Sequence, residues 1–235
     1  MKLLLVLLLL ALACGEAVGW IREYTFINNI TDWASAKTYC RNNHTGLANV
    51  TTSVENKRLI KSGSGSEGWL GLQVNITTLN DSDPTFFNWC PGCPSKYVKC
   101  VFTNTEGFWN TGFCMNKKGF YCYRFLILVK IKMTWEEAQD YCRAKYTGLA
   151  SVISEASLQQ VIEESAQTQT ENVWTGLSFI NGIWLWVSRE LLGDQVSMPP
   201  QCPAPPYRCG SVNTTSNTLN IQNCNDKLNF VCFKK

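Results

Sequence analysis

Hydrophobic residues recur at helical spacing in residues 32–41, where Trp33, Ala36 and Cys40 fall at positions i, i+3 and i+7. This spacing places the three side chains on one face, so it predicts an amphipathic helix. Residues 134–145 repeat the same pattern of hydrophobic and polar positions and predict a second helix of the same kind.

Short polar residues and glycines mark the ends of these two helices. Asp32 and Thr134 stand at the N-cap positions, where a side-chain oxygen can accept from a backbone N–H of the first turn. Gly46 and Gly148 follow the last turn of each helix. Glycine adopts the left-handed conformation readily, so we expect both to end their helices in that conformation.

A further helix is predicted after each of the first two, over residues 53–60 and 154–164. In the first, Thr52 and Glu55 have the three-residue spacing of a capping box, in which each side chain accepts from the backbone of the other. In the second, Ser154 can cap the helix alone.

The remaining hydrophobic runs are short and rich in β-branched and aromatic residues, which is typical of strands. Long segments rich in Pro, Asn and Ser separate some of them. The helices come early in the pattern and most strands follow them, and this order predicts the α+β class. The expected strands are 24–27, 69–72, 100–103, 120–123, 125–129, 174–177, 209–212 and 230–233.

The whole pattern occurs twice. At an offset of 102 residues, the segment Tyr39-Cys40-Arg41 matches Tyr141-Cys142-Arg143, and the offset grows to 110 by Cys122 and Cys232 without any change of order. This indicates a tandem duplication of one module. We call residues 20–123 the first copy and residues 124–235 the second copy, and expect each to be one domain.

The composition of the chain excludes several classes of function. The 235-residue chain is 45% hydrophobic and 17% charged, which is enough apolar material for a core. A net charge of +3 with no basic run argues against nucleic-acid binding. The one histidine, His44, excludes sites that need two or more histidines, such as a classical zinc finger. We therefore expect no enzymatic activity, no catalytic residue and no cofactor.

The N-terminus and the twelve cysteines indicate an oxidising compartment. Residues 1–19 combine Lys2, an apolar run over 3–13 and small residues, which predicts a signal peptide too short to span a membrane. No later stretch is long enough to span one, so we expect a secreted, extracellular protein. Six N-glycosylation sequons agree with this: Asn29, Asn43, Asn49, Asn75, Asn80 and Asn213.

These residues resemble the C-type-lectin-like domain superfamily. The resemblance is carried by the first helix of each copy, by Trp69-Leu70-Gly71-Leu72 and Trp174-Thr175-Gly176-Leu177, and by four ordered cysteines per copy. It implies two α+β domains in tandem, each with two helices, short antiparallel strands and a long irregular loop region. It also implies the disulfides Cys40–Cys122, Cys100–Cys114, Cys142–Cys232 and Cys209–Cys224.

Sugar-binding members of that superfamily hold Ca²⁺ with two loop segments rich in acidic and amide side chains. Aligned with the first segment are Cys93-Pro94-Ser95 and Cys202-Pro203-Ala204. The second aligns with Trp109-Asn110-Thr111 and Leu219-Asn220-Ile221. Ca²⁺ prefers six to eight oxygen ligands, several of them carboxylates. The positions at Cys93, Ser95, Thr111, Cys202, Ala204 and Ile221 lack carboxylates, so we expect no metal at either site.

Three cysteines of the mature chain fall outside the implied pairs: Cys90, Cys93 and Cys202. Three interpretations remain open: a Cys90–Cys93 bridge with Cys202 unpaired, a Cys93–Cys202 bridge, or a bond between chains that would give a disulfide-linked dimer. Trp89-Cys90-Pro91-Gly92-Cys93 also resembles a thioredoxin-type redox site, which requires a helix after the first cysteine to lower its pKa. An oxidoreductase using Cys90 and Cys93 is therefore a further hypothesis.

We expect a recognition protein that binds an extracellular carbohydrate or protein through its long loops, without calcium. The alternative is a disulfide-linked structural or assembly protein that binds no glycan. Nothing in the sequence indicates a nucleic-acid or membrane partner. The candidate ligand-binding residues are Lys96, Tyr97, Trp109, Asn110, Tyr207, Arg208 and Asn220.

Overall fold

The computed structural model describes residues 20–74, 86–192 and 202–235. The expected signal peptide and the sequons at Asn75 and Asn80 lie outside the described residues. Within those three stretches, none of the helices is long and apolar enough to cross a membrane. The chain forms two compact units, of which one contains residues 22–125, 154–160 and 234–235 and the other contains residues 20–21, 126–153 and 161–233 of the described chain.

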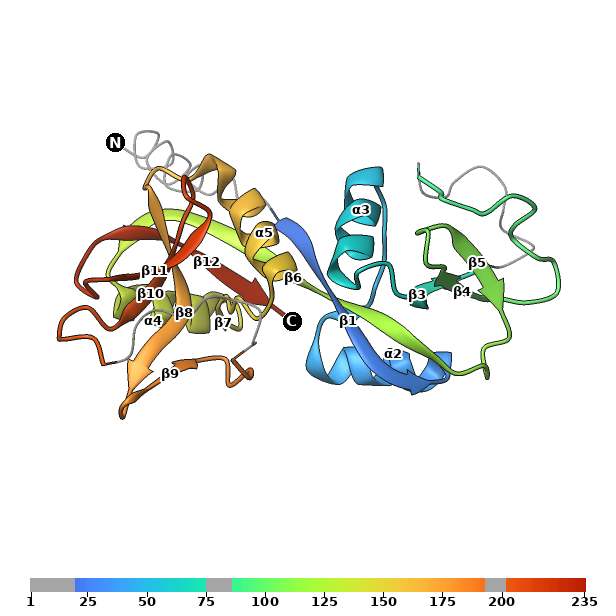
Figure 1. Ribbon diagram of the computed structural model, residues 1–235, viewed down its shortest axis with the longest axis horizontal. Coiled ribbons are helices and arrows are strands. Elements are labelled where there is room, and N and C mark those ends of the chain that lie inside the picture. Colours follow the sequence, from blue (N-terminus) through green and yellow to red (C-terminus); the bar gives the residue numbers. More distant parts are fainter. Residues whose placement is uncertain (1–19, 75–85, 193–201) are drawn as a thin grey trace, which may run out of the picture. The chain divides into compact units, whose positions relative to one another are not determined.

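The unit that contains residues 22–125 combines two helices with short strands (Figure 1). In its sheet the strands follow the order β6-β3-β4-β5, with β3 parallel to β6 and the other two pairs antiparallel. Strands β1 and β2 also pair with β6. The elements are β1 (Trp20–Thr31), α2 (Trp33–Asn43), β2 (Gly46–Leu47), α3 (Ser53–Ser62), β3 (Gly68–Gln73), β4 (Cys100–Thr103), β5 (Trp109–Gly112) and β6 (Lys118–Met133).

The other unit repeats this order of elements, with the strands arranged β12-β8-β10-β11. Strand β8 is parallel to β12, β7 pairs with β12, and β9 forms an antiparallel hairpin with β8. Both copies mix helices with strands, so the expected α+β class is confirmed. The elements are α4 (Trp135–Lys145), β7 (Gly148–Leu149), α5 (Glu155–Glu164), η1 (Ser165–Gln167), β8 (Asn172–Ile180), β9 (Ile183–Trp186), β10 (Cys209–Asn213), β11 (Thr218–Gln222) and β12 (Leu228–Lys234).

Buried tryptophans are held by the same hydrogen bonds in both copies. Trp33 Nε1 donates to the Leu70 carbonyl at 2.8 Å, and the equivalent bond from Trp135 to Thr175 has the same length. A buried indole N–H needs an acceptor, and here the facing strand supplies it. The duplicated sequence therefore specifies a duplicated set of core contacts.

The glycine of each Trp-x-Gly-Leu segment is required by close backbone packing. A Cβ added at Gly71 would lie 2.5 Å from the Leu47 carbonyl oxygen, and one added at Gly176 would lie 2.9 Å from the Leu149 oxygen. The N–H of Gly71 donates to the Ala48 carbonyl at 2.7 Å. A side chain here would push two hydrogen-bonded segments apart.

The strands expected at 120–123 and 125–129 are one strand, β6, so the prediction of a break between them is wrong. No Gly, Pro or Asn lies between the two runs to interrupt the strand, and residues on both sides are buried. The end of the first copy and the start of the second are therefore continuous in secondary structure.

Gly46 and Gly148 do not end the helices in a left-handed conformation. Each lies in a two-residue strand, and neither has a positive φ. An added Cβ would meet an aromatic ring: that of Tyr123 at 3.4 Å from Gly46, and that of Phe233 at 3.3 Å from Gly148. Both glycines make room for a ring.

The predicted N-caps are present, but the capping boxes differ from expectation. Thr52 accepts from the N–H of Glu55 at 3.1 Å, but the Glu55 carboxylate accepts from the N–H of Thr51, at 2.7 Å, and from Arg22. The box at Thr52 is therefore only half formed. A complete box occurs instead at α4, between Thr134 and Glu137.

Five disulfides join the described cysteines. Four are the pairs that the family resemblance implied: Cys40–Cys122, Cys100–Cys114, Cys142–Cys232 and Cys209–Cys224. The fifth is Cys90–Cys93, and Cys202 is exposed and unpaired. Of the three arrangements left open by the sequence, the structure therefore has the first.

Candidate functional site

In the first copy, residues 88–90 lie along strand β5 and bring the long loop against it. The N–H of Trp109 donates to the Asn88 carbonyl at 2.7 Å, and the N–H of Cys90 donates to the Trp109 carbonyl at 2.9 Å. Trp89 and Trp109 form a parallel bridge. This pairing places the Cys90–Cys93 turn next to Asn110.

The two segments that would carry calcium ligands meet in the first copy. The N–H of Ser95 donates to Thr111 Oγ1 at 2.9 Å. Asn110 Oδ1 accepts from the N–H of Thr111 at 2.8 Å and lies 3.4 Å from Cys93 Sγ. The alignment of the two segments from the sequence therefore identified residues that are neighbours in space.

The groups gathered there do not fit calcium. The donor set consists of a disulfide sulfur, an amide, a serine and a threonine, and it includes no carboxylate. The amide oxygen of Asn110 and the hydroxyl of Thr111 already accept backbone hydrogen bonds. A hard divalent cation needs more oxygen ligands and more negative charge than this. In the three described stretches, no group of three or more His, Cys, Asp or Glu side chains is placed to hold a metal ion.

Trp109 is not available to a ligand, so its assignment as a candidate binding residue is wrong. Its side chain is fully buried, and Nε1 donates to Asn56 Oδ1 at 2.9 Å. The indole packs edge-on against Phe86 and Trp89. The sequence predicts no strand over Trp109-Asn110-Thr111, whereas these residues form one whose alternate side chains face the core.

Other predicted residues of the first copy are accessible. Tyr97 is 91% exposed and Lys96 is also exposed, whereas Asn110 is partly buried. Sequence reasoning missed Phe87, which is 41% exposed and stacks on Trp89 with an interplanar angle of 18°. The sequence did contain a signal for this exposure, the run Phe86-Phe87-Asn88-Trp89. An extended segment with aromatic residues on both faces cannot bury all of them.

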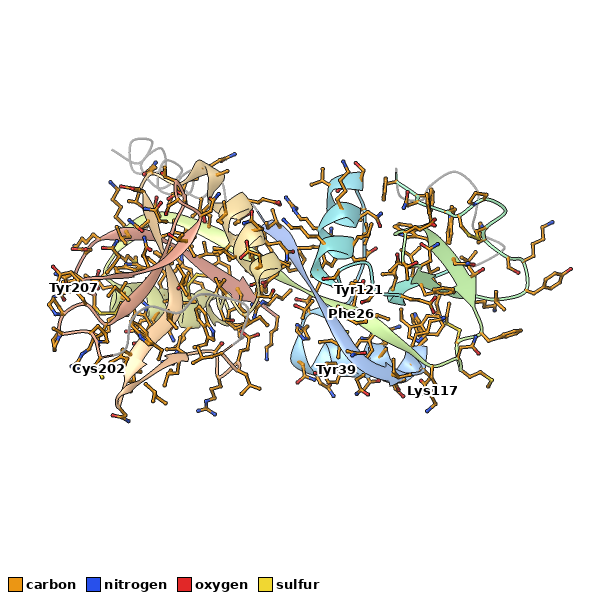
Figure 2. The ribbon with its side chains drawn as sticks, viewed as in Figure 1. Phe26, Tyr39, Lys117, Tyr121, Cys202 and Tyr207 are labelled. Carbon is orange, nitrogen blue, oxygen red and sulfur yellow. A yellow bond between two sulfur atoms is a disulfide. The ribbon has the colours of Figure 1, made fainter. Side chains whose placement is uncertain are left out.

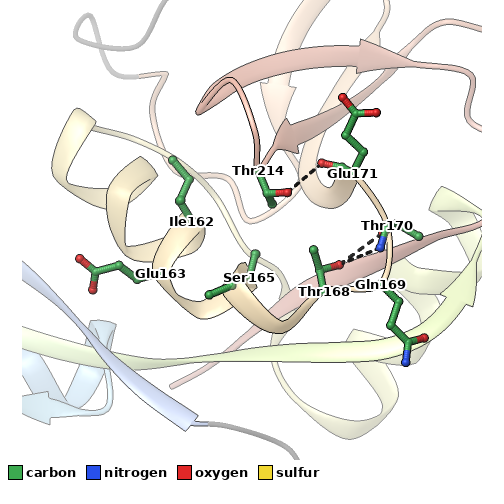
Figure 3. A pocket seen from close by; sticks show the side chains of 9 residues that line it. Ile162, Glu163, Ser165, Thr168, Gln169, Thr170, Glu171 and Thr214 are labelled. Carbon is green, nitrogen blue, oxygen red and sulfur yellow. Dashed lines mark hydrogen bonds between the residues drawn. The ribbon is translucent and has the colours of Figure 1, made fainter.

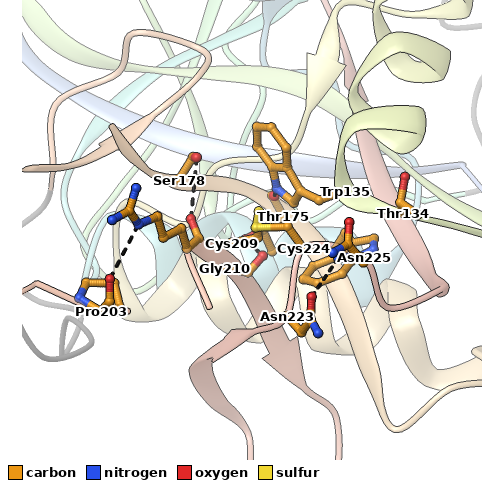
Figure 4. The surroundings of a disulfide bond; sticks show 12 residues. Thr134, Trp135, Thr175, Ser178, Pro203, Cys209, Gly210, Asn223, Cys224 and Asn225 are labelled. Atoms are coloured by element: carbon orange, nitrogen blue, oxygen red, sulfur yellow. Dashed lines mark hydrogen bonds between the residues drawn. A yellow bond between two sulfur atoms is a disulfide. The ribbon is translucent and has the colours of Figure 1, made fainter. Parts of the chain in front are cut away.

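The second copy presents a different loop surface. Tyr207 is 50% exposed, and its N–H donates to the Ala204 carbonyl at 2.9 Å. Arg208 is exposed, and its Nε donates to the Pro203 carbonyl at 3.4 Å. Figure 4 shows Pro203 and the Cys209–Cys224 disulfide. Figure 2 labels Cys202 and Tyr207 on this loop.

Asn220 occupies in β11 the position that Asn110 occupies in β5. It pairs with Ser211, two residues after Cys209, just as Asn110 pairs with Phe102, two residues after Cys100. Its Oδ1 accepts from Thr218 Oγ1 at 3.2 Å, and neighbouring Ile221 offers no polar atom from its side chain. The second copy therefore also lacks a carboxylate at these positions.

The Cys90–Cys93 bridge lies in a turn and not at the start of a helix. Residues 91–99 contain no helical residue, and Gly92 has a φ of +81°. Without a helix N-terminus behind it, the Cys90 thiolate lacks the stabilisation on which a thioredoxin-type site depends. The geometry therefore does not support the oxidoreductase hypothesis.

Two carboxylates whose pKa values are lowered, Glu55 and Asp32, lie at the starts of helices and not in the long loops. Partial burial raises the pKa of Glu55, but hydrogen bonds from Thr51 and the ion pair with Arg22 outweigh it and hold that pKa below its usual value. The hydrogen bond from the backbone of Ser35 lowers the pKa of Asp32, the cap of α2. These groups stabilise helix starts.

Comparison with known proteins agrees with the duplicated pattern. A family model described as the lectin C-type domain matches residues 30–124 and again 131–234. The chain is 24% identical to lymphocyte antigen 75 of Mesocricetus auratus over 265 residues, covering 90% of this chain and 15% of that protein. It is 20% identical to the secretory phospholipase A2 receptor of Oryctolagus cuniculus, covering 91% of this chain and 18% of that protein.

The chain thus spans less than a fifth of the length of these relatives. Among solved structures, human lithostathine matches with 27% identity and a TM-score of 0.42, covering 48% of this chain and 92% of that one.

Proposed function

Because the chain belongs to the C-type lectin domain family, we propose that it is a secreted, non-enzymatic protein that recognises an extracellular carbohydrate or protein through its long loops, without calcium. One observation carries the proposal. In the first copy the two segments at the calcium position are tied directly to each other by the bond from Ser95 to Thr111, and no carboxylate is among their side chains.

Exposed loop side chains support a binding role without a metal. In the first copy Phe87, Lys96 and Tyr97 offer aromatic faces and a positive charge to a ligand. Aromatic rings can pack against the apolar faces of sugars or protein side chains. In the second copy Tyr207 and Arg208 offer the same two kinds of group.

The histidine supports a non-enzymatic role. His44 follows α2 as its C-cap residue, and its backbone N–H donates to the Cys40 carbonyl at 2.8 Å. It lies within the sequon of Asn43 and not in the loop region. A general base acts beside a nucleophile in a pocket, whereas His44 lies at a half-buried helix end.

A glycan and protein-ligand array tests the proposal. The glycosylated chain, produced in a secretory host, is applied with calcium and again with EDTA, and the hits are repeated with Tyr97→Ala and Tyr207→Ala. We expect hits that survive EDTA and lose at least fivefold in affinity in one of the two variants. Binding that EDTA abolishes would overturn the calcium-independent mechanism. As a matched control, Tyr39→Ala changes a tyrosine on helix α2, and we expect it to leave binding unchanged.

A second candidate is a disulfide-linked assembly protein, which the free, exposed Cys202 favours. Cys90 and Cys93 bond to each other, so Cys202 has no described partner within the chain. Non-reducing electrophoresis of the wild type and of Cys202→Ser distinguishes the candidates. A dimer band that the substitution removes, with no array hits, supports assembly, whereas a monomer band alone excludes a covalent dimer.

A further inference from the structure

The Cys90–Cys93 bridge is the disulfide of the described chain that solvent reaches most directly. Both of its cysteines are partly exposed, whereas each of the other four bridges has at least one cysteine that is no more than 3% exposed. Gly92 lies in the turn between the two cysteines, and a Cβ added there would meet nothing within 4 Å. An external thiol can therefore approach this bridge, while the fold shields a cysteine of each of the others.

This bridge also closes a shorter loop than the others do. It spans 3 residues, whereas the other four span 14, 15, 82 and 90. In the chain-entropy model the stabilisation from a disulfide rises with the length of the loop that it closes, so opening this one costs the fold least. Disulfides that are exposed are also the ones that thiol exchange opens most readily.

The structure has a hydrogen-bond acceptor in place for the reduced form. Cys93 Sγ lies 3.4 Å from Asn110 Oδ1. A disulfide sulfur carries no hydrogen, so in the bridged form this contact has no donor. A Cys93 thiol has one S–H, a weak donor, and the amide oxygen on β5 is within its reach. Reduction therefore creates a hydrogen bond at the point where the bridge is lost.

The bridge helps to position the loop that carries two candidate ligand-binding residues. The N–H of Cys90 donates to the Trp109 carbonyl at 2.9 Å, which fixes one end of the turn to β5. From there, the S–S bond and the N–H of Cys93, which donates to the Cys90 carbonyl at 2.9 Å, set the course of the chain toward Lys96 and Tyr97. Without the bridge, the turn keeps its hydrogen bonds but loses its covalent closure.

We propose that Cys90–Cys93 is a thiol-exchange site at which an extracellular dithiol reductant loosens the ligand-binding loop of the first copy. A thiolate of the dithiol attacks one sulfur of the bridge, the S–S bond breaks, and a mixed disulfide forms. The second thiolate of the dithiol then displaces that sulfur. The dithiol leaves oxidised, as a disulfide, and the two cysteines of the chain take up two electrons and two protons. The chain is the substrate of this exchange and not its catalyst, and the effect on ligand binding rests on the proposed function.

Differential alkylation of the full, glycosylated chain tests whether the bridge opens selectively. The Cys202→Ser variant is used, so that Cys202 cannot exchange with the pair. The folded protein is treated with limiting dithiothreitol, new thiols are trapped with N-ethylmaleimide, and the labelled peptides are quantified by mass spectrometry. We expect Cys90 and Cys93 to be trapped at least tenfold faster than Cys114 and Cys224, the partly exposed cysteines of the bridges that span 14 and 15 residues. Equal rates would overturn the proposal.

Amide hydrogen exchange tests whether reduction loosens the loop. After the same partial reduction, we expect exchange in residues 91–97 to rise at least tenfold. The connection 168–171 is the internal reference, because it contains no cysteine and is held by hydrogen bonds such as the one from Thr214 Oγ1 to the Glu171 carbonyl at 3.0 Å (Figure 3). An unchanged rate in residues 91–97, or an equal rise in both segments, would overturn the proposal.

Ligand binding separates this proposal from the proposed function. Array hits that Tyr97→Ala weakens should lose at least fivefold in affinity on partial reduction, whereas hits that depend on Tyr207 should not change. The double variant Cys90→Ala/Cys93→Ala should show the same loss and no further response to dithiothreitol. Tyr97-dependent hits whose affinity reduction leaves unchanged would overturn the thiol switch and leave the proposed function standing. An array without hits would contradict the proposed function, and alkylation and hydrogen exchange would still decide whether the bridge opens.

Discussion

The backbone N–H of Ser95 donates to the hydroxyl of Thr111 at 2.9 Å, and so joins two segments that lie sixteen residues apart in the chain. These positions align with the calcium-binding segments of the superfamily that the sequence resembles. Here one hydrogen bond and the Cys90–Cys93 turn hold the same part of the loop. Residues 90–95 are therefore held by groups of the protein itself, namely a disulfide and a hydrogen bond.

Replacing Thr111 with valine should loosen this part of the loop. Thr111 is 9% exposed, so its removal leaves the Ser95 N–H without its acceptor in a partly buried setting. We expect a loss of about 1–2 kcal/mol in the free energy of unfolding, measured by urea denaturation. Thr111→Ser keeps the hydroxyl and should lose much less. A loss in Thr111→Ser as large as that in Thr111→Val would contradict the prediction, because serine lacks the methyl group but keeps the acceptor for the Ser95 N–H.

Gly71→Ala should strongly destabilise the protein, because the new Cβ would lie 2.5 Å from the Leu47 carbonyl oxygen. Backbone must move to relieve this contact, so we expect a loss of at least about 2 kcal/mol by chemical denaturation. Gly112→Ala is the matched control, since its Cβ would meet only ordinary contacts from 3.4 Å outward. A Gly71→Ala variant as stable as Gly112→Ala would contradict the packing argument.

Several elements were predictable because local chemistry decides them. The helices at α2 and α4 follow from the spacing of Trp33, Ala36 and Cys40 and from a cap residue directly before each helix. The continuity of β6 was not predictable, because two hydrophobic runs separated by Arg124 are equally compatible with two strands. Tertiary pairing with strands distant in sequence decides between these alternatives.

The candidate site was only partly predictable, for a related reason. The resemblance to the calcium-binding segments of the C-type-lectin-like superfamily identified Ser95 and Thr111 as members of one site, and the structure places them in contact. Alignment could not show that Trp109 faces the core, since burial depends on which face of β5 packs inward.

The two kinds of disulfide in the first copy should differ in their effect on stability. Cys40–Cys122 closes a separation of 82 residues, which the chain-entropy model values at roughly 4–5 kcal/mol. Cys90–Cys93 spans only 3 residues and should contribute less than about 2 kcal/mol. Thermal unfolding of the two double alanine variants checks this order. A larger loss from removing Cys90–Cys93 would show that the turn supports more of the fold than its loop length implies.

The stability of the first copy should depend on pH through Glu55. Its pKa is lowered in the folded state, so its contribution is complete above its ordinary value of 4.5 and is lost as the pH falls through the lower, folded value. Glu55→Gln should cost roughly 2 kcal/mol at pH 7, because the hydrogen bonds from Arg22 and Thr51 lose their charged acceptor. Denaturation at pH 7 and pH 3 should show a smaller gap between variant and wild type at the lower pH. If the difference in the free energy of unfolding between Glu55→Gln and the wild type were the same at both pH values, the loss would come from packing and not from the charge.

The four sequons in the described residues should not be glycosylated equally. Asn29, Asn43 and Asn49 are exposed, whereas Asn213 is 7% exposed, and both ends of its amide are used. Its Nδ2 donates to Glu171 and its Oδ1 accepts from the N–H groups of Thr215 and Ser216. A glycan on Nδ2 would have to occupy space inside the fold.

We therefore expect Asn213 to remain unmodified when the chain is produced in a secretory eukaryotic host. Enzymatic deglycosylation in heavy-oxygen water, followed by peptide mass spectrometry, marks each occupied asparagine. Asn213→Gln should leave the mass of the glycoprotein unchanged apart from the substitution, whereas Asn29→Gln should remove one glycan. Label at Asn213 would contradict the prediction, because a sugar on this buried nitrogen would require the turn between β10 and β11 to open.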